Sequence, residues 1–253
     1  MVVQVREGLL TTYAEDTAPP AGRVLVATAV PAERDAVARA LTEGPDAGHA
    51  AHAAHIDVLA VGVGPAAAAA GTATALARAA ATGRPYGLVV SAGIGGGFPP
   101  HAPVGSLVVA DEITVADLGA ETPDGFAPVT ELGFGAVTHR PPAALVREVA
   151  DACGAATGTV LTVSTVTGSA ERAAELRLRH PRALAEAMEG FGVAEAAALH
   201  GLPVLEIRAV SNPVGPRDRA AWRIGDALAA LTEAFGKFAP VLRSWNPHGN
   251  THT

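Results

Sequence analysis

The stretch YGLVVSAGIGGGF, residues 86–98, says most about the fold of this 253-residue chain. Its first half is an unbroken apolar run, which is typical of a strand buried on both faces of a parallel sheet. Its second half is rich in glycine, and glycines at the carboxyl end of such a strand let a ligand approach the backbone closely. We therefore expect a ligand-binding edge where this strand ends.

Expected strands and helices alternate on both sides of this stretch. The other expected strands are 23–30, 56–64, 105–117, 157–169 and 203–212. The expected helices are 32–41, 65–81, 142–154, 183–201 and 220–245. This alternation predicts a single three-layer α/β/α domain with a mixed, mostly parallel central sheet. We assign the domain to residues 22–245, between a flexible N-terminal extension (1–21) and a flexible tail (246–253).

Composition limits the function classes. Apolar residues make up 49% of the chain and charged residues 17%, which is enough apolar material for a sizeable core. The net charge of −7 disfavours a nucleic-acid partner, since such proteins carry a basic face. The single cysteine, Cys153, is expected to be a small buried residue and suits a reducing cytosol. No secretory signal or membrane span is apparent, so we expect a cytoplasmic protein.

Two further patterns are weak signals. Residues 62–67, GVGPAA, fit the G-x-G-x-x-A pattern of dinucleotide sites, but no acidic residue follows at the required distance. A tight turn with close helix packing is favoured, and such a turn can still border a pocket. His49, His52 and His55 have a spacing that could suggest a metal, yet no cysteine or acidic cluster joins them. We expect a solvated loop there, no metal and no organic cofactor.

A second apolar strand ends in polar side chains. In LEIRAVSNPVG, residues 205–215, the run stops at Ser211 and Asn212, three residues after Arg208. Polar groups at the carboxyl end of a strand in an α/β protein are where ligands usually bind. The sequence therefore predicts that Asn212 holds part of a ligand. The alternative is a turn-forming asparagine before Pro213.

Three segments together resemble one superfamily. TAVPAERDAV (28–37), SAGIGGGF (91–98) and AMEGFGVAEAAALHGLPVLEIRAVSN (187–212) resemble, in this order, the purine nucleosidases and nucleoside phosphorylases. Within it the chain is similar to the methylthioadenosine/S-adenosylhomocysteine nucleosidases and, more closely, to the futalosine hydrolases of menaquinone biosynthesis. The resemblance covers about residues 23–245. It implies an N-glycosyl hydrolase that acts as a homo-oligomer and cleaves futalosine with water into hypoxanthine and dehypoxanthinyl futalosine.

The resemblance also implies roles for particular residues. It matches Glu33 to the acidic residue that positions the attacking water, and Arg208 to an arginine near that water. It matches Glu189, beside Met188, to the carboxylate that binds the ribose 2′- and 3′-hydroxyls. It matches the pair Ser211 and Asn212 to the residues that bind the purine. The other predicted substrate-binding residues are Gly93, Ile94, Gly95, Thr165, Phe98, Phe191 and Arg217.

Some of these assignments leave alternatives open. Thr165 stands where adenine nucleosidases carry the aromatic that stacks on the purine, so Phe191 or Phe98 would have to supply that face. Arg217 or Arg219 would bind the carboxylate of futalosine. Their positions in the sequence do not decide between the members of either pair.

The chemistry of the residues fits these roles. An ionised Glu33 can orient a water molecule and accept its proton, although an acidic residue in the first turn of a helix also complements the helix dipole. Glu189 lies among apolar residues, where an unpaired charge is costly and two hydroxyl donors would compensate it. Arg208 could instead form an ion pair with Glu206. The amide of Asn212 can donate to O6 and accept from N7–H, which favours a 6-oxopurine over adenine.

Three other functions remain open at this point. A phosphorylase would need an arginine-containing phosphate loop where this chain has Glu33, whose charge would repel phosphate; only the adjacent Arg34 favours it. A nucleosidase or phosphorylase could act on inosine, methylthioadenosine or aminodeoxyfutalosine. A non-catalytic nucleoside- or dinucleotide-binding protein would bind without turnover.

Overall fold

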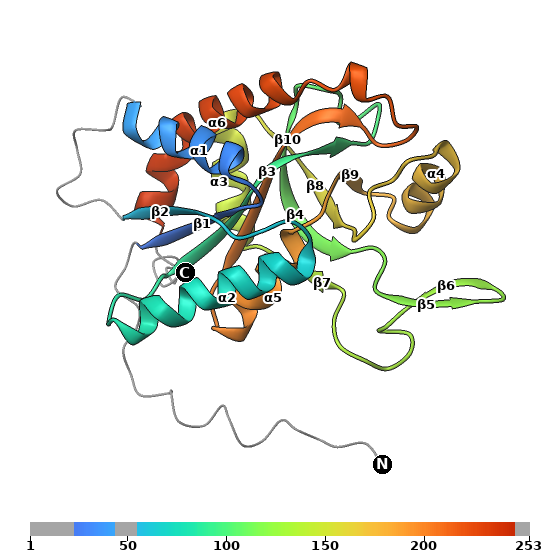
Figure 1. The fold of residues 1–253 in the computed structure, drawn as a ribbon, viewed down its shortest axis with the longest axis horizontal. Helices are drawn as coiled ribbons and strands as arrows, with labels where there is room; N and C mark the ends of the chain where they lie inside the picture. The colour runs from blue at the N-terminus through green and yellow to red at the C-terminus, as the bar shows by residue number, and fades with distance from the viewer. Residues whose placement is uncertain (1–22, 44–54, 246–253) are drawn as a thin grey trace, which may run out of the picture.

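The computed structural model describes residues 23–43 and 55–245, which form the helices and strands of Figure 1. The strands are β1 (Val24–Thr28), β2 (Ile56–Ala60), β3 (Leu88–Gly97), β4 (Leu107–Val115), β5 (Gly119–Thr122), β6 (Gly125–Pro128), β7 (Thr138–His139), β8 (Ala156–Thr162), β9 (Ala183–Ala187) and β10 (Val204–Pro213). The helices are α1 (Pro31–Glu43), α2 (Pro65–Ala81), α3 (Ala143–Cys153), α4 (Ala170–Arg179), α5 (Gly190–Leu199) and α6 (Ile224–Ser244), with a 3-10 turn η1 at Arg219–Ala221. The two predicted flexible ends, 1–21 and 246–253, lie outside the described residues.

The main sheet closes on itself. The described residues form an eight-stranded sheet in the order β10-β4-β8-β9-β3-β1-β2, with β7 beside β4, and β10 pairs with β3 as well. Strands β3, β10, β4, β8 and β9 therefore make a closed ring, from which β1 and β2 extend as a flat continuation. β5 and β6 form a separate hairpin that projects from the body (Figure 1).

Strand β3 has a different partner along each part of one edge. Its first residues, from Leu88 to Ser91, pair in parallel with β1, whereas Gly96 and Gly97 pair antiparallel with β9. The opposite edge pairs with β10 along its whole length. The edge of β3 between Ser91 and Gly96 is therefore left without a strand partner, because β1 and β9 diverge there.

Helices cover both faces of the sheet. Helices α1, α3 and α6 pack on one face around Phe235 and Phe238, and α2 and α5 pack on the other (Figure 1). Helix α4 packs through Leu176 on a smaller apolar cluster beside the ring. Cys153 is buried in the first of these clusters, as predicted. The predicted three-layer α/β/α arrangement with a mixed central sheet is confirmed.

The predicted helix over residues 183–201 is wrong in its first part. Residues 183–187 form strand β9, and the helix begins only at Gly190. Ala-Leu-Ala-Glu-Ala has a high helix propensity, but here the backbone pairs with β8 on one side and β3 on the other, and tertiary context overrides propensity. The predicted strand 157–169 also ends early, at Thr162, and the hairpin β5–β6 and helix α4 were not predicted from the sequence.

Candidate active site

The unpaired edge of β3 is filled by a side chain from helix α1. The backbone N–H of Ile94 donates to Oε1 of Glu33 at 2.9 Å. The other oxygen, Oε2, accepts from the N–H groups of Ala29 at 2.9 Å and Val30 at 3.3 Å. Glu33 stands in the first turn of α1 and is only 4% exposed. The gap between β1 and β9 thus places a buried carboxylate at the edge of the glycine-rich strand.

Gly93 allows two charged side chains to meet beside β3. A Cβ at this position would lie 2.5 Å from Oε1 of Glu33 and 2.7 Å from Nη1 of Arg208. Both distances are far below ordinary van der Waals contact, so any larger residue would displace one of these side chains. The glycine predicted here to border a ligand is required by the protein's own carboxylate and guanidinium.

Arg208 is buried and lies between acidic groups. Its side chain is 1% exposed; Nε donates to Oε1 of Glu206 at 2.9 Å, and Nη1 donates to Oε2 of Glu189 at 3.3 Å. Nη2 donates to the hydroxyl of Ser91 at 3.0 Å. Burial alone would lower the pKa of Arg208, but the charges of Glu206, Glu189 and Glu33 outweigh it and raise that pKa. The ion pair with Glu206, considered above as an alternative, therefore coexists with the contacts to the predicted site.

Glu189 lies at a strand–helix junction. It is the residue before α5 and is 6% exposed, rather than a member of a long helix as predicted. Its Oε1 accepts from the backbone N–H of Gly64 at 3.1 Å. Gly64 has φ 86° and Gly62 has φ 111°, values that favour glycine. The turn at residues 62–67 thus borders the site by holding Glu189.

Ser211 and Asn212 lie at the carboxyl end of β10, next to the same glycines. The register between β10 and β3 shifts between Val210 and Asn212, which makes Ser211 the extra residue of a bulge. The Ser211 hydroxyl lies 3.2 Å from the carbonyl of Gly95 and 2.8 Å from Oδ1 of Asn212. Nδ2 of Asn212 donates to the carbonyl of Pro213 at 3.1 Å, which fixes the orientation of the amide, because a carbonyl can only accept.

The two predicted aromatic residues are both buried. Phe98 is 1% exposed and belongs to the apolar cluster around Leu161 and Leu176. Phe191 is 6% exposed, its ring centroid lies 5.3 Å from that of His139, and it packs in the core under α5. Neither ring presents an open face for stacking in this conformation.

The remaining predicted residues lie around the rim. Met188 is partly exposed beside Glu189, and Thr165 is exposed in the loop after β8. Arg217 is exposed; its guanidinium lies over the ring of Trp222 at 5.3 Å, and its side chain runs within 3.9 Å of the place where a Cβ of Gly168 would be. Arg217 therefore adjoins the loop that carries Thr165.

Sequence reasoning missed parts of this arrangement. Glu206, Ser91 and Gly64 all contact the predicted residues, but Glu206 entered the sequence analysis only as an alternative partner. Glu206 carries a readable signal, namely a charged residue inside an otherwise apolar strand. Gly64 and Ser91 carry none, because their roles depend on which segments the fold brings together.

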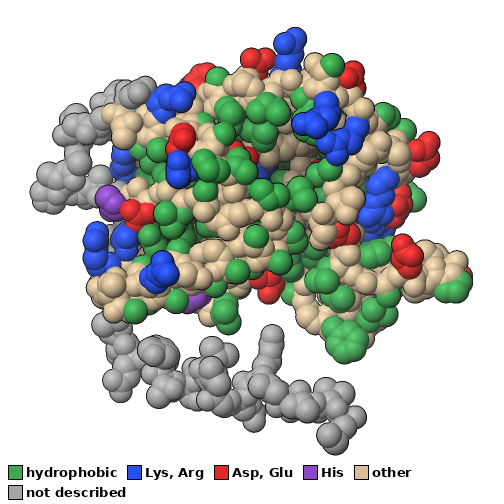
Figure 2. Space-filling view, viewed as in Figure 1, with side chains coloured by type: hydrophobic (Ala, Val, Ile, Leu, Met, Phe, Trp, Pro, Cys, Tyr) green, Lys and Arg blue, Asp and Glu red, His purple; other side chains and the backbone are tan. Residues whose placement is uncertain are grey.

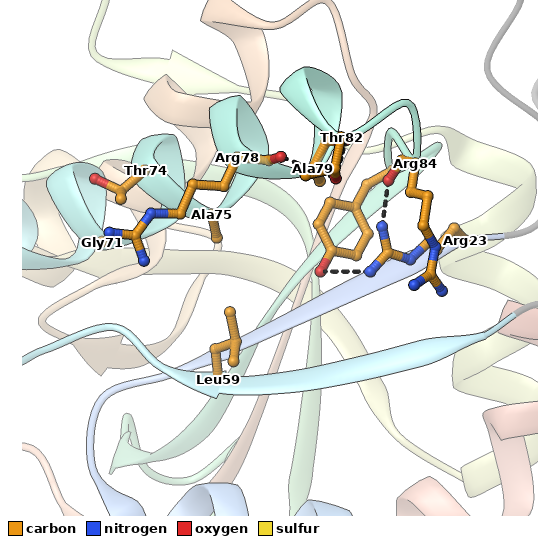
Figure 3. A pocket seen from close by; sticks show the side chains of 10 residues that line it. Arg23, Leu59, Gly71, Thr74, Ala75, Arg78, Ala79, Thr82 and Arg84 are labelled. Carbon is orange, nitrogen blue, oxygen red and sulfur yellow. Dashed lines mark hydrogen bonds between the residues drawn. The ribbon is translucent and has the colours of Figure 1, made fainter.

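A separate cavity lies between α2 and the first strands (Figure 3). None of the predicted site residues lines it. Arg23 there bonds to Asp57 at 2.6 Å and lies over the ring of Tyr86, whose hydroxyl donates to Asp57 at 2.8 Å. Burial and the neighbouring Asp57 raise the pKa of Tyr86 to about 12. Arg23, Asp57 and Tyr86 bond to one another, although Nε of Arg23 has no partner among the described residues. The residues predicted from the motifs lie at the edge of β3 instead, which is therefore the candidate active site.

The described residues contain no cluster of three or more potential metal ligands. His55 lies 2.9 Å from Asp57, whereas His49 and His52 fall outside the described ranges. No helix in 23–43 or 55–245 is long and apolar enough to cross a membrane. Figure 2 shows basic and acidic side chains interspersed on one face, without a single basic patch.

The closed mixed sheet with acidic side chains at its glycine-rich edge is the fold of the nucleosidases and nucleoside phosphorylases. A methylthioadenosine/S-adenosylhomocysteine nucleosidase from Neisseria meningitidis superposes with a TM-score of 0.68 at 19% identity, over 88% of this chain and 99% of that one. A futalosine hydrolase mutant of Helicobacter pylori gives 0.70 at 17% identity, over 86% and 98%.

The chain belongs to the phosphorylase superfamily, whose family model matches residues 23–244. It is 73% identical to a futalosine hydrolase of Streptomyces coelicolor over 231 residues, which are 89% of this chain and 98% of the relative. It is 46% identical to a futalosine hydrolase of Acidothermus cellulolyticus, over 83% of this chain and 88% of that one. The resemblance seen in the sequence is thereby confirmed.

Proposed function

We propose that this protein hydrolyses the N-ribosidic bond of futalosine, releasing hypoxanthine and dehypoxanthinyl futalosine, as a cytoplasmic step of menaquinone biosynthesis. The observation that carries the proposal is the 73% identity, over 89% of the chain, to the futalosine hydrolase of Streptomyces coelicolor. The positions of Glu33 and Asn212 at β3, with Glu189 bonded to the neighbouring Arg208, support the same reaction.

The two glutamates have suitable hydrogen-bonding capacity left. A carboxylate has about four lone-pair sites. The three backbone N–H groups bound to Glu33 leave about one site, which suits a single water molecule. Among the described residues, Glu189 accepts only from Gly64 and Arg208, which leaves about two sites for the two ribose hydroxyls. Glu33 therefore acts as the base that orients water towards the anomeric carbon, and Glu189 holds the sugar.

The amide of Asn212 has unused hydrogen-bonding groups that match those of the purine. Of its two N–H donors one is used by the Pro213 carbonyl, and of the two lone pairs on Oδ1 one is used by the Ser211 hydroxyl. One donor and one acceptor remain, which match O6 and N7–H of hypoxanthine as a leaving group. Asn212 pairs with Gly96 and Glu33 contacts Gly93, so the purine site and the water site are three residues of strand apart, about 10 Å.

The position of Arg34 argues against phosphate as the nucleophile. This residue was the one feature in favour of phosphorolysis, but its side chain is partly exposed and pairs with Asp35 at 2.7 Å. The cation that faces the cluster is Arg208, and it is already surrounded by carboxylates. A phosphate dianion would meet the charges of Glu33 and Glu189 in a buried environment, where like charges repel strongly.

A chromatographic assay tests the proposal. Futalosine, aminodeoxyfutalosine, methylthioadenosine and inosine are each incubated with the protein, with and without phosphate. We expect hypoxanthine to be released from futalosine at a rate that does not depend on phosphate. Glu33→Gln removes the base and should lower kcat by roughly 10²–10⁴-fold, whereas the exposed Glu233→Gln on α6 serves as the control. Release that requires phosphate would reject hydrolysis in favour of a phosphorylase.

We also propose that the protein acts as a homo-oligomer. Large apolar side chains are exposed just before and after the hairpin that projects from the body, at Leu118, Leu132 and Phe134, the last being 66% exposed. Association would remove this apolar surface from water. Light scattering after size exclusion measures the mass directly, and a monomer at micromolar concentration would reject this part of the proposal.

A further inference from the structure

Glu206 is a fully buried carboxylate that the proposed reaction does not use. It lies near the start of β10 with 0% of its surface exposed, two residues before Arg208 and therefore on the same face of the strand. Its Oε1 accepts from Nε of Arg208 at 2.9 Å, while Oε2 has no hydrogen-bond partner among the described residues. A charge is expensive to keep at such a position, so its presence requires an explanation.

Glu206 fits against Gly190, the first residue of α5. A Cβ at Gly190 would overlap both carboxylate oxygens of Glu206. The carboxylate thus packs directly on the backbone at the amino end of α5, where the helix dipole favours negative charge. Gly190 and Glu206 are matched in shape: the glycine makes the room that the carboxylate fills.

The contacts of Arg208 show what this carboxylate fixes. Glu206 occupies Nε and Ser91 occupies Nη2, which leaves Nη1 as the nitrogen that reaches Glu189 and the carbonyl of Ile94. Two contacts on one edge of a planar guanidinium determine its orientation. The direction of Nη1 is therefore set by Glu206 and Ser91, not by the residues that face the substrate.

The distribution of charge around Arg208 also indicates a role for Glu206. One guanidinium is surrounded by Glu206, Glu189 and Glu33, and the contact with Glu189 is the longer ion pair, 3.3 Å against 2.9 Å with Glu206. Without the charge of Glu206, Arg208 would draw Glu189 into a tighter pair and offset more of its negative charge. The cation-like sugar would then face less negative charge.

We propose that Glu206 is a positioning residue: it neutralises and orients Arg208, and so keeps the negative charge of Glu189 and Glu33 available to the ribosyl group. This inference rests on the proposed function, because it assigns Glu206 a role in that reaction. Glu206 acts only through Arg208 and touches no substrate atom.

Titration of Glu206 gives a readout that a merely structural role would not produce. Burial raises the pKa of Glu206, against the opposing effect of Arg208; the other charged group that faces it is Glu189, while Glu33 acts on the same Arg208 from α1. As the pH falls through this raised pKa, Glu206 becomes neutral and the wild type comes to resemble Glu206→Gln. The kcat ratio of the two proteins should therefore shrink towards low pH.

The kinetic test uses Glu206→Gln, which keeps the size of the side chain and one acceptor oxygen, with Glu233→Gln as the exposed control. At neutral pH we expect kcat for futalosine to fall by up to about 100-fold with little change in KM, because the affected interaction forms chiefly in the transition state. A wild-type kcat, or a loss that is the same at every pH, overturns the inference.

A second variant covers the possibility that Glu206→Gln does not fold. Gly190→Ala retains every charged group but forces the Glu206 carboxylate away from α5, so it should lower kcat to a similar extent. The double variant should be no worse than either single variant, because both act on one contact. Full activity in Gly190→Ala, or additive losses in the double variant, contradicts the role of Glu206.

If the wild type cleaves none of the nucleosides, the proposed function is overturned. The inference on Glu206 is then tested by thermal unfolding, which needs no substrate. A carboxyl whose pKa is raised by folding stabilises the fold most at pH values below its ordinary 4.5, and this stabilisation is lost as the pH rises through the raised value. The Tm of Glu206→Gln minus that of the wild type should therefore increase as the pH rises from about 4.5. A difference independent of pH overturns the inference on Glu206 by itself.

Discussion

Gly93→Ala tests the geometry of the site with a single methyl group. The added Cβ would lie 2.5 Å from Oε1 of Glu33 and 2.7 Å from Nη1 of Arg208, where ordinary contact begins at 3.4 Å. Gly93 lies in β3, whose backbone is paired with β10, so the side chains rather than the strand must move. The carboxylate of Glu33 is then pushed away from the N–H of Ile94, to which it is bonded at 2.9 Å.

The size of the effect follows from that bond. A hydrogen bond to a charged group contributes about 1.5–3 kcal/mol. If the loss appears fully in the barrier, kcat falls roughly 10- to 100-fold, since each 1.4 kcal/mol is a factor of ten. The same displacement exposes or strains a buried carboxylate, so we also expect a lower Tm.

Steady-state kinetics with futalosine, together with thermal unfolding, measure both effects. Gly87→Ala is the matched control, because Gly87 precedes the same strand and a Cβ there would meet only the carbonyl of Arg23, at 3.8 Å. The control should keep its kcat and Tm. If Gly93→Ala retains the kcat of the wild type, the carboxylate does not need its bond to Ile94, and the assignment of Glu33 as the base that orients water fails.

Three further predictions concern recognition of the purine by Asn212, recognition of the substrate carboxylate by Arg217, and the pH dependence of stability. Asn212→Asp should reduce kcat/KM for futalosine relative to aminodeoxyfutalosine by up to roughly 10⁴-fold, since a carboxylate repels O6; unchanged selectivity in a competition assay would count against the role of the amide. Arg217→Ala should reduce kcat/KM for futalosine but not for inosine, and equal losses for both would remove Arg217 from carboxylate recognition. Burial alone would raise the pKa of Asp57, but Tyr86, Arg23 and His55 outweigh it and lower that pKa from 3.8; the stability it contributes is present above about pH 4 and is lost as the pH falls further. The Tm of Asp57→Asn should therefore lie below that of the wild type at neutral pH and approach it in acid, and a constant difference would show that the charge of Asp57 is not responsible.

Local pattern was informative where a segment's environment follows from its own composition. The apolar run that begins β3 and the expected helices 65–81 and 142–154 each predict an element that the structure contains. Segments 183–187 and 170–179 show where local pattern was not enough, because strand β9 and helix α4 were not predicted from the sequence. The first has helix-forming residues in a strand, because two neighbouring strands take up its backbone groups.

The residues of the candidate site also differ in how much the sequence alone could predict about them. Glu33, Glu189 and Asn212 were predicted through a resemblance carried by motifs; the structure places Glu33 and Asn212 against β3 and Glu189 against Arg208. Phe98 and Phe191 could be named as aromatic candidates from the sequence, but their burial could be learned only from packing. The role of Gly190 was invisible until Glu206 lay against it.

The sequence by itself determined the alternation of apolar strands and helices, and hence the layered α/β class, because periodicity and composition act locally along the chain. Only the tertiary structure decided that β1 and β9 diverge along one edge of β3 and that Glu33 fills the gap. It also decided that Arg208 is shared by three glutamates. The physical reason is that these arrangements depend on contacts between segments far apart in the chain, whose hydrogen bonds and buried charges are satisfied only after the sheet has closed.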